Sequence, residues 1–153
     1  FRMAAGIDIV HVPYRGAAPA MTDLMSGHIS IMFAGGPSAT TQIRAGRLKL
    51  LAVASAERSP AFPGVPTMAE SGVPGFDARA WWGVVAPART PAPVVKRLNE
   101  EFNRALAATD VRERFSGQGA DAVIMAPAQF GAFIKDEVAK WARVVRDSGA
   151  RAE

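Results

Sequence analysis

The chain has 153 residues, of which 49% are hydrophobic and 21% charged, with a formal net charge of +4 at pH 7. This length and hydrophobic content allow a globular core and argue against a disordered chain. The absence of cysteine excludes disulfides, thiolate metal sites and a cysteine nucleophile. The basic residues are scattered and alternate with acids near the C-terminus, which favours solvated helix faces over a nucleic-acid-binding surface.

The first 55 residues predict strands that alternate with helices. Gly27 and Gly46 stand where helix ends favour glycine, and Pro19 and Pro37 fall in the first turns of the two helices. Such alternation indicates an α/β fold with parallel strands joined by right-handed crossovers. The expected order is strand 7–14, helix 18–26, strand 28–34, helix 37–45 and strand 48–55.

A connection rich in proline and glycine follows over residues 59–75, and then an apolar run over 76–86 that predicts a strand. Successive side chains of a strand point to opposite faces, so Trp81 and Trp82 cannot both enter one core. We expect Trp82 on the exposed side, facing a cleft, and Trp81 in the packed interior.

The remainder is predicted to be mainly helical. Thr90 and Pro91 open one amphipathic helix, and Pro127 opens a longer one that Gly149 closes. A short helix over 111–116 and a short strand over 122–125 lie between them. The aromatic residues of the long helices recur at helical spacing and are expected in a core.

Two turns that carry glycine precede the first two helices, at Tyr14 to Ala18 and at Ala34 to Ser38. In a parallel sheet, both helix N-termini would lie at one edge. Unpaired backbone N–H groups and the positive end of the helix dipole make such an edge favourable for an anion. The two turns therefore predict binding of a small acid.

No catalytic, metal-binding or cofactor-binding pattern is found. A Gly-x-Ser-x-Gly sequence is absent, and no acid accompanies His11 or His28 at a metal-ligand spacing. The Gly-x-Gly-x-x-Ala sequence at residues 117–122 follows a helix and precedes a strand, which is the reverse of a dinucleotide site. We expect no enzyme activity, no metal and no cofactor.

Several short sequences, taken in order, resemble the substrate-binding receptors of tripartite tricarboxylate transporters, often called Bug receptors. They include Val12-Pro-Tyr-Arg-Gly16, the stretch from Ala18 to Gly27, Val65-Pro-Thr67, Glu70-Ser-Gly72, Pro74-Gly-Phe76, Trp82-Gly83 and Ala86-Pro-Ala-Arg-Thr-Pro91. The resemblance implies a type II periplasmic binding protein with two α/β lobes and crossover strands. It also implies a periplasmic location, a small organic carboxylate clamped between the lobes, and delivery of that ligand to membrane transporter subunits.

In such receptors the two turns hold the ligand carboxylate through backbone N–H groups and bridging water. The resemblance thus implies ligand-binding roles for Tyr14, Gly16, Ala17, Ala18, Ala34, Gly35, Ser38 and Trp82. Many relatives carry Asp where this chain has Ala34, and an Asp there suits a ligand ammonium. Its absence favours a plain organic acid over an amino acid.

Family members are roughly twice this length, and the chain begins as if within a helix, so we expect the N-terminal half of the fold to be missing. Residues 1–79 would be an incomplete second lobe, and residues 80–153 the strand and helices that return to the first lobe. Without that lobe, the returning helices predict a homo-oligomer. Two alternatives stay open: a truncated, self-associating fragment that binds no ligand, and a small hydrolase-type enzyme.

Overall fold

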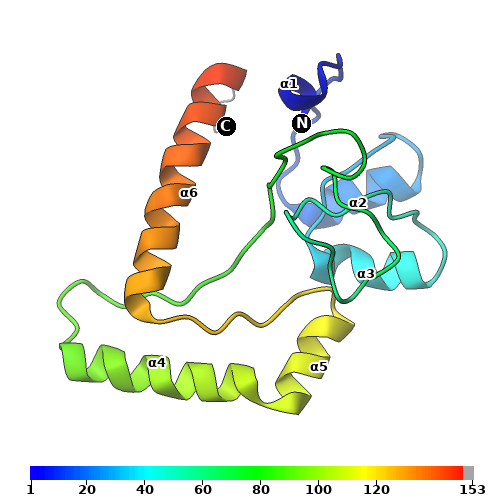
Figure 1. The fold of residues 1–153 in the computed structure, drawn as a ribbon. Helices are drawn as coiled ribbons and strands as arrows, with labels where there is room; N and C mark the ends of the chain where they lie inside the picture. The colour runs from blue at the N-terminus through cyan, green and yellow to red at the C-terminus, as the bar shows by residue number, and fades with distance from the viewer. Residues whose placement is uncertain (150–153) are drawn as a thin grey trace. The chain divides into compact units, whose positions relative to one another are not determined.

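In the computed structural model, which describes residues 1–149, the regular elements are helices joined by long non-helical segments (Figure 1). The helices predicted over 18–26, 37–45 and 111–116, and those opened by Thr90–Pro91 and by Pro127, are present, with ends that differ from the prediction by no more than two residues. A further short helical piece expected over residues 67–72 forms turns and no helix. The helices are α1 (Arg2–Ala5), α2 (Ala17–Met25), α3 (Gly36–Arg44), α4 (Ala92–Ala107), α5 (Thr109–Gly117) and α6 (Pro127–Ser148).

The predicted strands do not form hydrogen-bonded ladders. In the described residues, segments 7–14, 28–34, 48–55, 76–86 and 122–125 contribute a single isolated parallel bridge, between Val53 and Thr67. There the Val53 amide donates to Pro66 O at 2.9 Å and the Met68 amide donates to Val53 O at 3.0 Å. Pro66 has no N–H with which to extend pairing, and the chain turns away after Thr67. The prediction of a paired parallel sheet is therefore wrong for this chain.

The chain divides into two compact units. Unit 1 comprises Phe1–Gly83 with Thr109–Ala122, and unit 2 comprises Val84–Ala108 with the segment from Val123 onward. The division expected between residues 79 and 80 concerns the lobes of a longer receptor and stays a prediction.

The small core of unit 1 lies where α2 packs on α3 (Figure 1). Ala20 and Met21 of α2 and Ala39 and Thr40 of α3 are buried there. The small side chains of Ala20, Ala39 and Thr40 let the two helices approach closely. This contact places the N-termini of α2 and α3 within one unit.

The start of α3 is fixed by close contact with the residues that follow α5. A Cβ atom on Gly36 would overlap the carbonyl of Gly119, so only glycine fits at that position. The Thr40 hydroxyl, which is buried, lies 2.7 Å from Gly36 O and 3.0 Å from Gln118 O. The segment 117–122, rejected as a dinucleotide site, thus has a packing role.

In unit 2, the side-chain amides of two asparagines in α4 form hydrogen bonds with the backbone of Met125. Asn99 and Asn103 of α4 donate to Met125 O at 2.9 and 3.2 Å, and Asn103 Oδ1 accepts the Met125 amide at 3.4 Å. Asn103 therefore pairs with both backbone groups of Met125, as a neighbouring strand would. In the described part of unit 2 only Glu137 is buried, and the apolar side chains there are half-buried or exposed.

Among the described residues, none of the helices combines the length and the apolar character that crossing a membrane requires.

Candidate functional site

The two turns selected from the sequence adopt different backbone conformations. Gly16 precedes α2 with φ 111° and ψ 175°, a region that is essentially restricted to glycine. Gly35 precedes α3 with φ −69° and ψ 145°, which any residue adopts. The backbone therefore requires glycine at the first turn, while at the second turn the required glycine is Gly36.

The start of α2 offers the larger group of unpaired N–H donors. Within the described chain, the amides of Gly16, Ala17 and Ala18 donate to no acceptor, and no side chain caps the helix. The next residue, Pro19, has no N–H, so the first turn of α2 has no further backbone donor beyond these three amides. Such donors, at the positive end of a helix dipole, favour an anion.

The start of α3 offers fewer donors. The Gly36 amide has no acceptor in the described chain, and Pro37 has no N–H. The Ser38 amide donates to Gly35 O at 3.1 Å, and the Ser38 hydroxyl donates to the same oxygen at 2.8 Å. Ser38 can therefore accept a hydrogen bond from a bound molecule or water, but its own donors are used within the turn.

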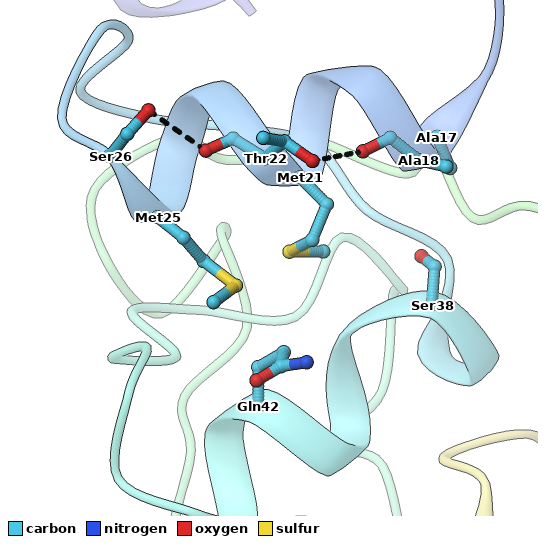
Figure 2. Close-up of a pocket in the computed structure, with 8 residues that line it drawn as sticks. All are labelled: Ala17, Ala18, Met21, Thr22, Met25, Ser26, Ser38 and Gln42. Atoms are coloured by element: carbon cyan, nitrogen blue, oxygen red, sulfur yellow. Dashed lines mark hydrogen bonds between the residues drawn. The ribbon is translucent and has the colours of Figure 1, made fainter.

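A hollow of about 680 Å³ opens between α2 and α3, a volume in the range typical of small-molecule sites (Figure 2). Figure 2 shows Met21 and Met25 projecting from α2 toward Ser38 and Gln42 of α3. Three of the predicted ligand-binding residues thus share one hollow, because Ala17, Ala18 and Ser38 also line it. The full lining is Ala17, Ala18, Met21, Thr22, Met25, Ser26, Ser38 and Gln42.

Most polar groups around the hollow are engaged with the backbone. The Thr22 hydroxyl donates to Ala18 O at 3.2 Å, and the Ser26 hydroxyl to Thr22 O at 2.9 Å (Figure 2). Gln42 is the exception, because its Oε1 atom is buried and accepts no hydrogen bond from any residue that the structure describes. A water molecule or a ligand hydroxyl in the hollow would satisfy this amide.

Tyr14 lies before α2 and is bound to the same helix. Its hydroxyl donates to Asp23 Oδ2 at 2.7 Å. This hydrogen bond, with desolvation and the negative charge of Asp23, raises the pKa of Tyr14 above its ordinary value. The phenol hydrogen is therefore committed to Asp23.

Four other predicted residues also lie outside the lining of the hollow: Gly16, Ala34, Gly35 and Trp82. Trp82 is 70% exposed, and its ring lies 3.5 Å from the position that a Cβ atom on Gly35 would occupy. Ala34 is exposed and precedes Gly35. Trp81, expected in a packed interior, is 39% exposed, because this segment forms no ladder that would turn one face to a core.

The geometry around His28 does not support a hydrolase. Ser26 Oγ lies 3.0 Å from His28 Nδ1, and Asp23 Oδ1 lies 3.5 Å from that same nitrogen. A Ser-His-Asp relay requires the serine and the acid on opposite ring nitrogens. In the part of the chain that the structure describes, no group of three or more His, Cys, Asp or Glu side chains could hold a metal ion.

The sequence reasoning missed the side chains that form the walls of the hollow: Met21, Thr22, Met25, Ser26 and Gln42. A signal for them is present. Ala18, Thr22 and Ser26 recur every four residues, as do Ala17, Met21 and Met25, so each set forms one stripe on a helix. Gln42 likewise follows Ser38 by one turn.

Comparison with known proteins gives one consistent result. The family model described as "Tripartite tricarboxylate transporter family receptor" matches residues 1–150. Protein BugT of Bordetella pertussis is 42% identical over 151 residues, which cover 99% of this chain and 46% of BugT.

Two solved structures are also similar. Rpa4515 of R. palustris, solved with adipate, has a TM-score of 0.87 and 31% identity over 97% of this chain and 50% of its own. The periplasmic binding protein BugD has a TM-score of 0.82 and 35% identity over 99% of this chain and 52% of its own. The chain therefore spans about half the length of each of these relatives, and over that half its fold is that of such receptors.

Proposed function

Because the chain belongs to the tripartite tricarboxylate transporter receptor family, we propose that it binds a small organic carboxylate at the N-termini of α2 and α3. The observation that carries this proposal is the set of unpaired amides at Gly16, Ala17 and Ala18, beside a hollow of ligand size. A carboxylate accepting from such amides forms charge-assisted hydrogen bonds and needs no matching arginine.

The two helix starts would have unequal roles. The amides at the start of α2 would contact the carboxylate directly, while α3 would contribute the Gly36 amide and, through water, the oxygen of Ser38. Arg15 is exposed and forms no ion pair in the described chain, so it would attract the anion over a distance. Trp82, lying over Gly35, would cover one side of the ligand.

The proposed ligand is a plain organic acid. The adipate in the Rpa4515 structure is such an acid. The hollow here is lined by the apolar side chains Met21 and Met25, and the hydroxyls of Thr22, Ser26 and Ser38 in its lining donate to the backbone. Ala34 provides no carboxylate for a ligand ammonium. In a complete receptor, the bound acid would be held in the periplasm and delivered to membrane transporter subunits.

The family consists of binding receptors and not of enzymes. The geometry at His28 agrees with this. Ser26 and Asp23 both lie next to Nδ1, so they cannot form a Ser-His-Asp relay, which needs them on opposite ring nitrogens. A hydrolase-type activity is therefore not part of the proposal.

The proposal includes self-association of the isolated chain. In unit 2 six large apolar side chains of α4 and α6 are 39–64% exposed: Val94, Leu98, Phe102, Val138, Trp141 and Val145. Large exposed apolar faces usually mark interaction sites. In the isolated chain, a second copy of the chain would cover these faces.

Calorimetric titration with a panel of acids tests the proposed function. The panel contains adipate, succinate and citrate, with glutamate as an amino acid and adipamide as an uncharged molecule of the same length as adipate. We expect at least one plain acid to bind and adipamide not to bind, because the amides select negative charge. If folded protein binds none of the acids, the alternative of a self-associating fragment without ligand binding is correct.

A further inference from the structure

One side-chain contact closes the turn in front of α2 onto the helix itself. Tyr14 lies three residues before the helix begins, and Asp23 lies near its other end. The 2.7 Å hydrogen bond between them spans nine positions of the sequence and is partly buried. Between Tyr14 and the helix stand only Arg15 and Gly16, and Gly16 has a φ of 111°.

This contact determines where the chain enters α2. A turn through a left-handed glycine can be oriented in several ways, since glycine restricts φ and ψ less than any other residue. The hydrogen bond from Tyr14 to Asp23 restricts the orientation of the turn at its first residue, and α2 restricts it at its last residue. The amides of Gly16, Ala17 and Ala18 then point in one direction.

We propose that Asp23 is a positioning residue of the carboxylate site, which holds Tyr14 so that the turn from Tyr14 to Ala17 presents its amides to the ligand. This inference rests on the proposed function. Asp23 does not line the hollow, so it acts through Tyr14 and not by touching the ligand. Tyr14 in turn supports the site with its backbone, because its one phenol hydrogen is donated to Asp23.

Asp23 suits this role although the ligand is an anion. Its Oδ2 accepts from the phenol, and its Oδ1 lies 3.5 Å from His28 Nδ1. Both carboxylate oxygens therefore lie next to Tyr14 and His28, and Asp23 is not among the residues that line the hollow.

Tyr14 is the only tyrosine in the chain, which gives the contact its own spectroscopic signal. The ultraviolet absorbance of tyrosinate, followed against pH, reports on this one phenol. The wild type should titrate above the ordinary tyrosine pKa, and Asp23→Ala should lower that pKa toward the ordinary value of about 10. A merely structural role for Asp23 elsewhere in unit 1 would leave this titration unchanged.

The functional part is a double-mutant cycle read by calorimetry, with adipate or whichever acid of the panel binds the wild type. Tyr14→Phe and Asp23→Ala should each weaken binding by about tenfold, the size expected for losing one charge-assisted hydrogen bond. The double variant should lose no more than either single one, because both remove the same contact. Asp23→Asn, which keeps an acceptor oxygen, should recover part of the affinity.

The matched control is Asp136→Asn on α6, an exposed residue outside unit 1, which makes the same change in net charge. It should bind as the wild type does. Unchanged affinity in folded Asp23→Ala, or losses that add in the double variant, would overturn the positioning role while leaving the proposed function intact. If the wild type binds no acid of the panel, the proposed function fails, and the positioning role fails with it.

Discussion

Arg58 holds the carboxylate of Glu70 with one nitrogen shared between two oxygens: Arg58 Nε lies 2.9 Å from Oε2 and 3.1 Å from Oε1. Glu70 Oε2 also accepts the Thr67 amide at 2.8 Å, and Thr67 Oγ1 accepts the Glu70 amide at 3.1 Å. The second pair is a reciprocal capping box. It fixes the connection between residues 59 and 75 beside the isolated Val53–Thr67 bridge.

These contacts give the stability of unit 1 a dependence on pH. The hydrogen bond from Arg58, followed by the Thr67 amide, lowers the pKa of Glu70 in the folded chain. A lowered folded pKa means that the stabilisation is complete above the ordinary glutamate pKa of about 4.3 and is lost as the pH falls through the folded value. Glu70→Gln should therefore be less stable than the wild type at neutral pH, and the difference should shrink in acid.

Urea unfolding of both proteins between neutral and acid pH measures this difference. Glu113→Gln on α5 is the control, since Glu113 is exposed and forms no ion pair in the described residues. A gap between wild type and Glu70→Gln that stays constant with pH would contradict the assignment.

Two adjacent glycines at the start of α3 should respond differently to alanine. At Gly36 a Cβ atom would overlap the Gly119 carbonyl, and a backbone neighbour cannot move aside cheaply. Gly36→Ala should cost about 1–3 kcal/mol of unfolding free energy, the usual cost of overpacking. At Gly35 a Cβ atom would meet the Trp82 ring at 3.5 Å, an ordinary contact, so Gly35→Ala should be tolerated.

Gly131→Ala provides the reference for that comparison. Gly131 lies within α6 with open space around its Cβ position, so alanine there should stabilise the helix by up to about 1 kcal/mol. The denaturant midpoints of the three variants, compared at an unchanged m-value, give the order of their stabilities. Equal stability of Gly36→Ala and Gly35→Ala would show that α3 does not pack on Gly119 as described.

The apolar faces of α4 and α6 should make the isolated chain an oligomer. A specific interface buries more than about 1,000 Å² in total, and six large apolar side chains of these helices are available to contribute. Light scattering at micromolar concentration should give a mass above that of one chain. Leu98→Glu together with Val145→Glu should reduce that mass, and a monodisperse 16.2 kDa species for the unchanged chain would contradict the prediction.

The helices were predictable because their signals are local. Pro37 and Pro127 stand in the first turns of α3 and α6, Gly149 follows α6 with a left-handed φ of 68°, and i→i+4 hydrogen bonds need no other segment. A parallel ladder needs a second segment in register over its whole length, which no local pattern guarantees. In the described chain no pair of segments meets this condition, and Val53 and Thr67 form a single isolated bridge.

The candidate site was predictable at its helix ends and not in its walls. Gly16, Ala17, Ala18 and Ser38 follow from turn chemistry, which the sequence displays. The need for glycine at Gly36 depends on the carbonyl of Gly119, which lies more than eighty residues later, and the Tyr14–Asp23 contact depends on how a side chain folds back along α2. Such contacts depend on tertiary packing that composition and spacing do not specify.

Gly16→Val tests the anion site at its most constrained residue. With φ at 111° and ψ at 175°, a β-branched side chain is strained, so the turn must change and move the amides of Ala17 and Ala18. Each charge-assisted hydrogen bond is worth about 1.5–3 kcal/mol, and about 1.4 kcal/mol corresponds to one decade, so binding should weaken by at least roughly tenfold. Arg15→Ala should weaken binding less, because an exposed cation attracts the ligand without contacting it.

The control for backbone strain is Gly27→Val. Gly27 also has a left-handed φ, of 79°, but it follows the other end of α2, away from the unpaired amides of Gly16, Ala17 and Ala18. It should lose stability in the same range as Gly16→Val, about 1–3 kcal/mol, because both force a branched residue into a glycine conformation. Yet its affinity for the acid should stay at the wild-type value. If Gly16→Val, shown to be folded by circular dichroism, binds the acid as tightly as Gly27→Val does, then the start of α2 does not hold the carboxylate.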